Sequence, residues 1–149
     1  MTKTVQVLEN HFPELRRAVS GPGLAKAVMA GGHVIKGNAK INIETTFSSK
    51  SVGELAGSIQ VVLDKATPTS AEASIGPTVI YGRIQELGGV IKPIKAKMLS
   101  WVEDGKRIFA HMVHIPARPY LRPAVDEHHP EILEAVSLQL RKDIEEATK

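Results

Sequence analysis

The chain has 149 residues and a net charge of +3, and its 42% apolar and 23% charged side chains are typical of one ordinary domain. The absence of cysteine excludes disulfides, thiolate metal ligands and cysteine nucleophiles. No apolar run approaches the roughly 20 residues of a membrane-spanning helix, and residues 1–10 lack the apolar core of a secretory signal. We therefore expect a single cytosolic domain over residues 1–149.

The N-terminal part of the chain is predicted to be helical. Residues 4–19 carry apolar side chains at helical spacing, and the Gly-Pro-Gly sequence at 21–23 predicts a stop. A second helix is expected over residues 24–41. Gly31 and Gly32 weaken it by about 1 kcal/mol each relative to alanine. Such small residues also permit the close approach of another element.

The middle of the chain favours antiparallel strands. Residues 48–57 are predicted to form a polar loop, and residues 58–64 and 71–75 two strands joined as a hairpin through residues 67–69. Gly-Pro at 76–77 predicts a turn.

A short helix over residues 79–87 is expected next, and Gly88 and Gly89 should terminate it. Lys92, Lys95 and Lys97 then lie in a stretch that Pro93 interrupts. This composition predicts an exposed basic loop around residues 88–97.

The C-terminal part predicts a second hairpin and a final helix. Asp104-Gly105 between the apolar runs 98–102 and 107–115 is typical of a hairpin turn. Three prolines over residues 116–123 predict an extended segment, and an amphipathic helix should follow from about Pro130. Together the elements predict an α+β fold, with an antiparallel sheet of about four strands and the N-terminal and C-terminal helices packed on one face.

The charge is unevenly distributed along the chain. Residues 83–122 carry 8 basic and 3 acidic side chains, whereas residues 123–149 carry 3 basic and 7 acidic ones. A basic part beside an acidic part indicates complementary surfaces, in one chain or between copies. Two alternatives remain: the basic part faces nucleic acid, or both faces are simply solvated.

The sequence favours a protein that is not an enzyme and holds no metal or cofactor. His111 and His114 are three residues apart on a predicted strand, so they face opposite sides, and the adjacent His128 and His129 diverge on a helix. No nucleophile elbow is present. Glu86 stands out because it lies in a mostly apolar stretch, where it is expected to pair with an arginine. A hydrolase or nuclease using His111, His114 or Glu86 remains an alternative.

Two segments carry a resemblance to a known family. They are Tyr-Gly-Arg-Ile-Gln-Glu-Leu-Gly-Gly at 81–89 and Ile-Pro-Ala-Arg-Pro-Tyr-Leu-Arg-Pro-Ala at 115–124, supported by a weaker match at 53–59. They resemble the tail-completion or head–tail joining proteins of tailed bacteriophages, also called minor tail or virion morphogenesis proteins. The motif residues are Tyr81, Glu86, Gly88, Gly89, Arg118, Pro119, Tyr120, Leu121, Arg122 and Pro123.

The second of these segments also has a physical interpretation. Pro119 and Pro123 fix the backbone and remove two N–H donors. Tyr120 and Leu121 supply apolar area, worth roughly 1.5–3 kcal/mol each if buried. Arg118 and Arg122 are expected to brace Glu86 or nearby carbonyl groups. We expect the segment to staple the terminal helix to the helix at 81–87; the alternative is that it shapes the fold and contacts no partner.

The resemblance implies a structural protein at the head–tail junction or the top of the tail of a phage or prophage. Copies would form a ring, commonly of six, between connector or head-closure proteins and tail-tube or tail-terminator proteins. Lys92, Lys95 and Lys97 would contact a neighbouring copy or the DNA in the lumen. The alternatives are a tail terminator or head-closure protein, and an accessory protein that binds DNA without sequence specificity.

Overall fold

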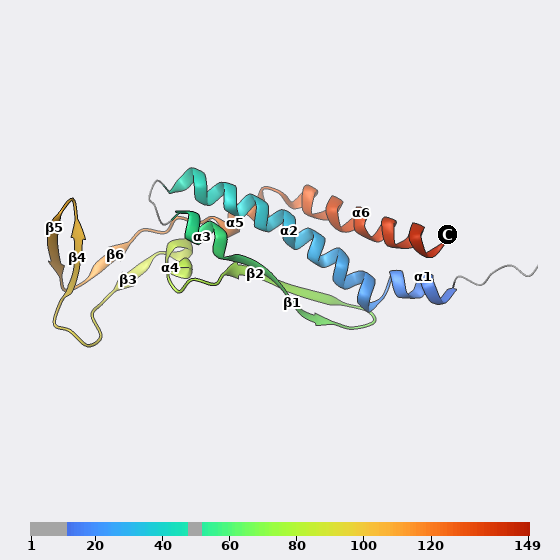
Figure 1. The fold of residues 1–149 in the computed structure, drawn as a ribbon, viewed down its shortest axis with the longest axis horizontal. Coiled ribbons are helices and arrows are strands. Elements are labelled where there is room, and N and C mark those ends of the chain that lie inside the picture. The colour runs from blue at the N-terminus through green and yellow to red at the C-terminus, as the bar shows by residue number, and fades with distance from the viewer. Residues whose placement is uncertain (1–11, 48–51) are drawn as a thin grey trace, which may run out of the picture.

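The computed structural model of the chain describes residues 12–47 and 52–149 (Figure 1). Its elements in chain order are α1 Phe12–Ala18, α2 Gly21–Thr46, α3 Val52–Ser58, β1 Ile59–Ala66, β2 Ala71–Pro77, α4 Gly82–Leu87, β3 Gly89–Ile91, β4 Leu99–Glu103, β5 Lys106–Ala110, β6 Val113–Ile115, α5 Leu121–Asp126 and α6 His129–Ala147. The predicted α+β class is confirmed, with antiparallel strand pairs and helices at both ends.

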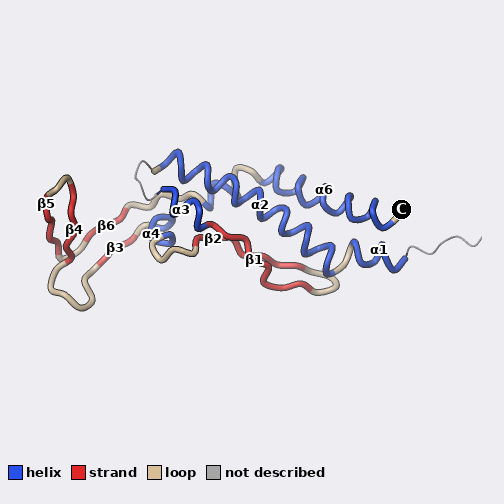
Figure 2. The backbone as a smooth tube through the Cα atoms, viewed as in Figure 1, coloured by secondary structure: helices blue, strands red, loops and turns tan. Residues whose placement is uncertain are grey.

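The strands do not form the single sheet of about four strands that the sequence predicted. They form three separate antiparallel pairs, β1–β2, β3–β6 and β4–β5. The reason lies after α4, where Gly88 adopts a φ of +69° and the chain turns away from β1–β2. The later strands therefore extend beyond the helices instead of joining the first hairpin (Figure 2).

Helix α2 is the central element of the fold. Helix α6 runs antiparallel along one side of it, and the β1–β2 hairpin lies along another (Figure 1). A Cβ atom on Gly31 would lie 2.9 Å from a methyl carbon of Val136 in α6, and one on Gly32 would lie 2.5 Å from a methyl carbon of Val61 in β1. The glycine pair thus admits two neighbours at once, as the sequence predicted for small residues there.

Two predicted boundaries are wrong at the ends of helices. The Gly-Pro-Gly sequence at 21–23 does not stop a helix but opens α2, because the first turn of a helix needs no N–H from Pro22. The break between α1 and α2 is at Val19 and Ser20. The predicted loop at 48–57 contains helix α3 from Val52 onward, while its residues 48–51, and residues 4–11 of the first predicted helix, lie outside the described residues.

The predicted hairpin of β1 and β2 is confirmed. Ile59 pairs with Pro77 at one end and Ala66 with Ala71 at the other. Residues 76–77, predicted to be a turn, belong to β2 because they pair with the start of β1. The Thr67 N–H donates to the Ser70 carbonyl over 2.7 Å and closes the connection.

The buried core lies where the C-terminal half of α2 meets α3, the start of β1 and α5. Its members are nearly or fully inaccessible to solvent: Ala39, Ile43, Leu55, Ala56, Ile59, Tyr120 and Ala124. Tyr120 is the largest of these side chains. One residue of the proline-rich segment is therefore part of the core.

Residues 89–115 form a projection that we call the arm (Figure 2). At its root Gly89 of β3 pairs with Ile115 of β6, so residues 89–91 are a strand and not part of the predicted loop. At its end β4 and β5 form the predicted hairpin, in which Asp104 and Gly105 have φ of +49° and +76°. Two successive positive φ values are those of a type I′ turn.

Candidate functional site

The Glu86 carboxylate is bonded to three consecutive backbone groups. Its Oε2 accepts from the Tyr120 N–H over 2.7 Å and from the Leu121 N–H over 2.9 Å, and its Oε1 accepts from the Arg122 N–H over 3.0 Å. These residues are the start of α5, where N–H groups lack partners within the helix. Glu86 of α4 therefore caps α5, and its negative charge also suits the positive end of the helix.

The two prolines of the segment at 115–124 that flank Tyr120, Leu121 and Arg122 delimit the backbone N–H groups that bind Glu86. Pro119 and Pro123 have no N–H, and all three residues between them donate to Glu86. The Arg118 N–H donates to the Gln85 carbonyl over 2.8 Å, just before Pro119. The chain from residue 118 to residue 122 is thus held to α4 by four backbone donors.

Tyr120 connects this network to α2. Its hydroxyl donates to the Gly82 carbonyl in α4 over 3.0 Å, and its own carbonyl accepts from the Asn42 side chain in α2 over 3.1 Å. Its ring meets the Phe47 ring edge-on, with 6.5 Å between centroids. Burial, and then the charge of Glu86, raise the pKa of Tyr120 to about 12. We call these contacts of Tyr120 and Glu86 the Tyr120 junction.

The predicted roles of the two arginines are wrong. Within the described residues, neither Arg118 nor Arg122 forms an ion pair with Glu86, whose carboxylate accepts from three backbone N–H groups instead. The Arg118 guanidinium instead lies 5.6 Å from the centre of the Phe47 ring, in a cation–π contact. Arg122 is exposed and contributes its backbone N–H.

The remaining motif residues lie around the junction. Tyr81 immediately precedes α4 and packs against the core, as does the half-buried Leu121. Gly88 ends α4, and a Cβ atom there would lie 2.7 Å from the Ala117 nitrogen. The segment therefore joins α4 to α5, and it reaches the terminal helix α6 through α5, not directly as predicted.

The histidines singled out in the sequence lie apart from the junction. His111 and His114 are exposed on the arm, and His128 Nδ1 lies 3.0 Å from Glu131 Oε2 at the start of α6. The described part of the chain holds no group of three or more side chains suited to a metal ion. Across residues 12–47 and 52–149, none of the helices combines the length and apolarity that crossing a bilayer requires.

Asp143 is a buried acidic residue that the sequence did not single out, because the charged residues next to it on α6, Lys142 and Glu145 among them, are exposed. It is 7% exposed and faces α2, where Lys26 lies 3.6 Å away. Gln139 also donates to its Oδ1 over 2.9 Å. An acidic residue in register with the inward-facing Ile132 and Val136 was the available signal.

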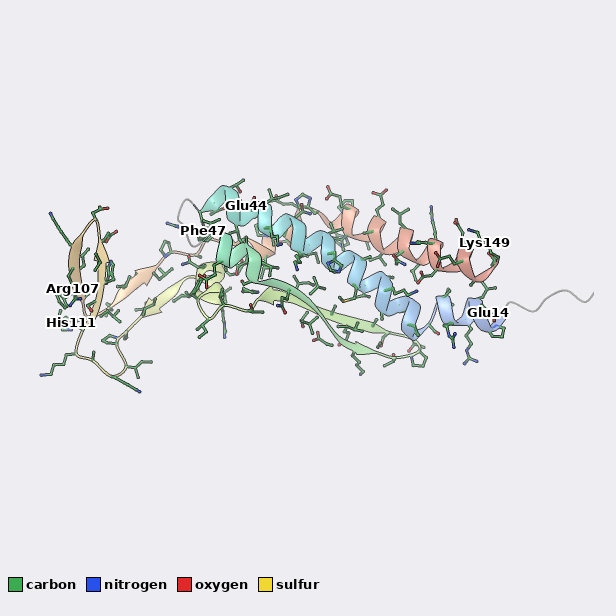
Figure 3. All side chains as sticks on the ribbon, in the orientation of Figure 1. Glu14, Glu44, Phe47, Arg107, His111 and Lys149 are labelled. Carbon is green, nitrogen blue, oxygen red and sulfur yellow. The ribbon has the colours of Figure 1, made fainter. Side chains whose placement is uncertain are left out.

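The arm exposes Lys92, Lys95 and Lys97, as the sequence predicted for its basic loop. Its apolar surface was not predicted. Ile94, Trp101, Val102 and Phe109 are 96%, 37%, 64% and 56% exposed. A hollow of about 490 Å³ on the arm is lined by Ile91, Leu99, Ser100, Trp101, Glu103, Val113 and Ile115. Arg107 and His111 mark this part of the arm, at the opposite end of the molecule from α1 (Figure 3).

Comparisons of the chain with protein-family models, with curated proteins and with solved structures find no match. The function is therefore inferred from the Tyr120 junction, the arm and the resemblance of the two motif segments.

Proposed function

We propose that the chain is a structural virion-assembly protein of a tailed phage or prophage. It would act at the head–tail junction or the top of the tail, by assembling with other copies into a ring. The observation that carries this proposal is that the segments at 81–89 and 115–124, which bear the resemblance, meet in the Tyr120 junction. The first segment supplies the Glu86 carboxylate and the second supplies the N–H groups that it binds, so the two segments form one structural unit.

The chemistry of the junction supports a scaffolding role. Both oxygens of Glu86 are occupied by N–H donors, and the Tyr120 hydroxyl is bonded to a carbonyl. These bonds hold α4 to the start of α5, and next to them Gly89 pairs with Ile115, where the chain enters and leaves the arm. An arm that is held at its root and exposes apolar and basic side chains is suited to contact with other subunits.

The resemblance supplies the partners of the proposal. Copies of the chain would form a ring, with six as the implied number, between connector or head-closure proteins and tail-tube or tail-terminator proteins. The ring would assemble in the host cytoplasm and remain in the virion. No enzymatic step and no cofactor are needed for this role.

The test is deletion of the gene from the phage or prophage genome that encodes it. Electron microscopy of the lysate should show filled heads and separate tails, and the wild-type gene supplied in trans should restore joined particles. The Glu86→Ala variant supplied in trans should restore fewer, whereas Glu72→Ala, which changes an exposed carboxylate of β2, should restore them fully. A normal yield of joined particles after deletion would overturn the proposal.

A second candidate function is binding of DNA without sequence specificity. It is favoured by Lys92, Lys95 and Lys97, which are exposed in a stretch, residues 90–102, without an acidic side chain. Three phosphate contacts predict that log K falls with log salt with a slope of about −2.7. Absence of binding to duplex DNA at low salt, in a fluorescence anisotropy titration, would exclude this candidate.

A further inference from the structure

The arm carries a surface that the other described residues, 12–47, 52–88 and 116–149, leave uncovered. Its strands pair with each other and project beyond the helices (Figure 2). A two-stranded hairpin alone is marginally stable in water and normally packs against a further layer. Trp101, 37% exposed, lies with the apolar hollow on one face of the β4–β5 hairpin, and this face is suited to such a layer. Val102 and Phe109 are exposed on the opposite face, because strand side chains alternate.

The charge of the arm restricts what can cover it. Residues 90–102 carry three lysines and no acidic side chain, and all three lysines are exposed. Over the whole arm, residues 89–115, there are five basic and two acidic side chains. An acidic surface that also offers apolar side chains is therefore complementary to the arm.

One surface of the chain has both properties. Residues 123–140 carry four carboxylates and neither lysine nor arginine. Ile132 and Val136 of α6 face Gly31 of α2, so the exposed side chains of α6 lie on its other sides. Helix α5 also packs on α2, with Ala124 buried in the core. We call this surface the acidic face; it comprises Asp126, Glu127, Glu131 and Glu134, with Val125, Leu133 and Leu138 at 40%, 54% and 55% exposure.

We propose that the arm of one copy binds the acidic face of a second copy. Within one chain the arm points away from α6 (Figure 1), so the two surfaces meet only between copies. Pairing of arm with arm, or of acidic face with acidic face, would place like charges together, which is unfavourable. The contact is therefore heterologous: it leaves the acidic face of the first copy and the arm of the second copy free to bind further copies.

This inference rests on the self-assembly of the proposed function and names the two surfaces that carry it. A heterologous contact gives a closed ring when the rotation between copies closes. The apolar side chains supply buried area, and the lysine–carboxylate pairs select the register and the partner. Such a contact weakens with salt, because the Debye length falls from about 10 Å at 0.1 M to about 3 Å at 1 M ionic strength.

Charge reversal of each surface tests the contact. The arm-reversed variant is K92E/K95E/K97E. Its matched control is K65E/R83E/K149E, which changes the net charge equally at exposed positions outside the arm. Sedimentation velocity and light scattering should show a concentration-dependent oligomer for the wild type and the control, and a monomer for the arm-reversed variant.

The face-reversed variant is D126K/E127K/E134K, which leaves Glu131 and its contact with His128 intact. Its matched control is E44K/E72K/E145K, at exposed positions outside the acidic face. The face-reversed variant should also be a monomer, whereas its control should form the wild-type oligomer. Far-ultraviolet circular dichroism and thermal unfolding verify that every variant is folded.

Mixing provides the decisive result. In an equimolar mixture the acidic arm of the arm-reversed variant meets the basic face of the face-reversed variant. The other contact joins the unchanged basic arm of the face-reversed variant to the unchanged acidic face of the arm-reversed variant. The two monomeric variants should therefore form a mixed oligomer of the wild-type size, and a single chain with both reversals should oligomerise alone. A monomeric wild type at about 0.1 mM, or no oligomer on mixing, would overturn the proposal.

These outcomes are separable from those of the deletion experiment. Joined particles that persist after deletion of the gene would refute the phage function but leave the contact between copies in place. Separate heads and tails after deletion, together with a failure of the charge exchange, would refute this contact and keep the function.

Discussion

Replacement of Glu86 by alanine removes the acceptor of three consecutive backbone N–H groups. A hydrogen bond to a charged group contributes about 1.5–3 kcal/mol. The Arg122 donor belongs to an exposed residue and can bond to water instead, whereas Tyr120 is fully buried and Leu121 half-buried. Counting these two donors, we expect the free energy of unfolding to fall by about 3–6 kcal/mol.

The loss is large but should leave a folded fraction, because domains of this kind have a free energy of unfolding of about 5–15 kcal/mol. For a chain of this size it corresponds to a fall in Tm on the order of 10 °C. Urea unfolding followed by circular dichroism measures the free energy. Amide hydrogen exchange adds a local measurement, since the Tyr120 and Leu121 amides should lose protection more than the strands of β1–β2.

Two further variants bracket the effect. Glu86→Gln retains one acceptor oxygen, but it loses the charge and turns an amide NH₂ toward backbone N–H groups. Its free energy of unfolding should therefore lie between those of the wild type and Glu86→Ala. Glu72→Ala, at an exposed position on β2, should change the free energy by less than about 0.5 kcal/mol. If Glu86→Ala also stays within that limit, the capping role assigned to Glu86 is wrong.

Gly32→Ala should lower the free energy of unfolding by about 1–3 kcal/mol, because the added methyl group would crowd Val61. Gly37→Ala on the same helix is the control: its Cβ atom would meet open space, so it should raise the free energy of unfolding by about 0.5–1 kcal/mol. Equal effects of the two substitutions in thermal unfolding would contradict the close approach at Gly32. Tyr120→Phe should cost about 1–2 kcal/mol, because the buried Gly82 carbonyl loses its donor. The raised pKa of Tyr120 means that the folded chain holds this proton above pH 10, so its contribution to stability is complete below pH 10 and is lost as the pH rises toward about 12. Urea titrations between pH 10 and about 12 should show that the free energy of unfolding falls less for Tyr120→Phe than for the wild type. An identical fall would refute the raised pKa assigned to Tyr120.

The sequence predicted the elements that local chemistry determines. Apolar periodicity located α2 and α6, and Asp104-Gly105 located the turn of the β4–β5 hairpin. Gly31 and Gly32 were correctly predicted to allow close approach. In each case the signal lies within a few neighbouring residues, and the structure uses it where it occurs.

The contacts of Glu86 could not be predicted in the same way. Its location in an apolar stretch indicated a partner, and the arginines 32 and 36 residues downstream were the obvious choice by charge. The true donors are backbone N–H groups, which almost every residue possesses, so no side chain in the sequence marks them. The division of the strands into three pairs is likewise set by the direction that the chain takes after Gly88.

Because Glu86 binds backbone N–H groups, the cap does not depend on the side chains of the residues that donate them. Positions 121 and 122 should therefore accept many amino acids in a library of randomised codons, as far as the cap is concerned, while proline should be depleted at both because it removes a donor. Position 86 should retain glutamate in the same selection. The full Arg-Pro-Tyr-Leu-Arg-Pro sequence at 118–123 would then be a weaker sign of common ancestry than a simpler pattern. That pattern is an acidic residue at position 86 together with prolines at 119 and 123, which leave three N–H groups between them.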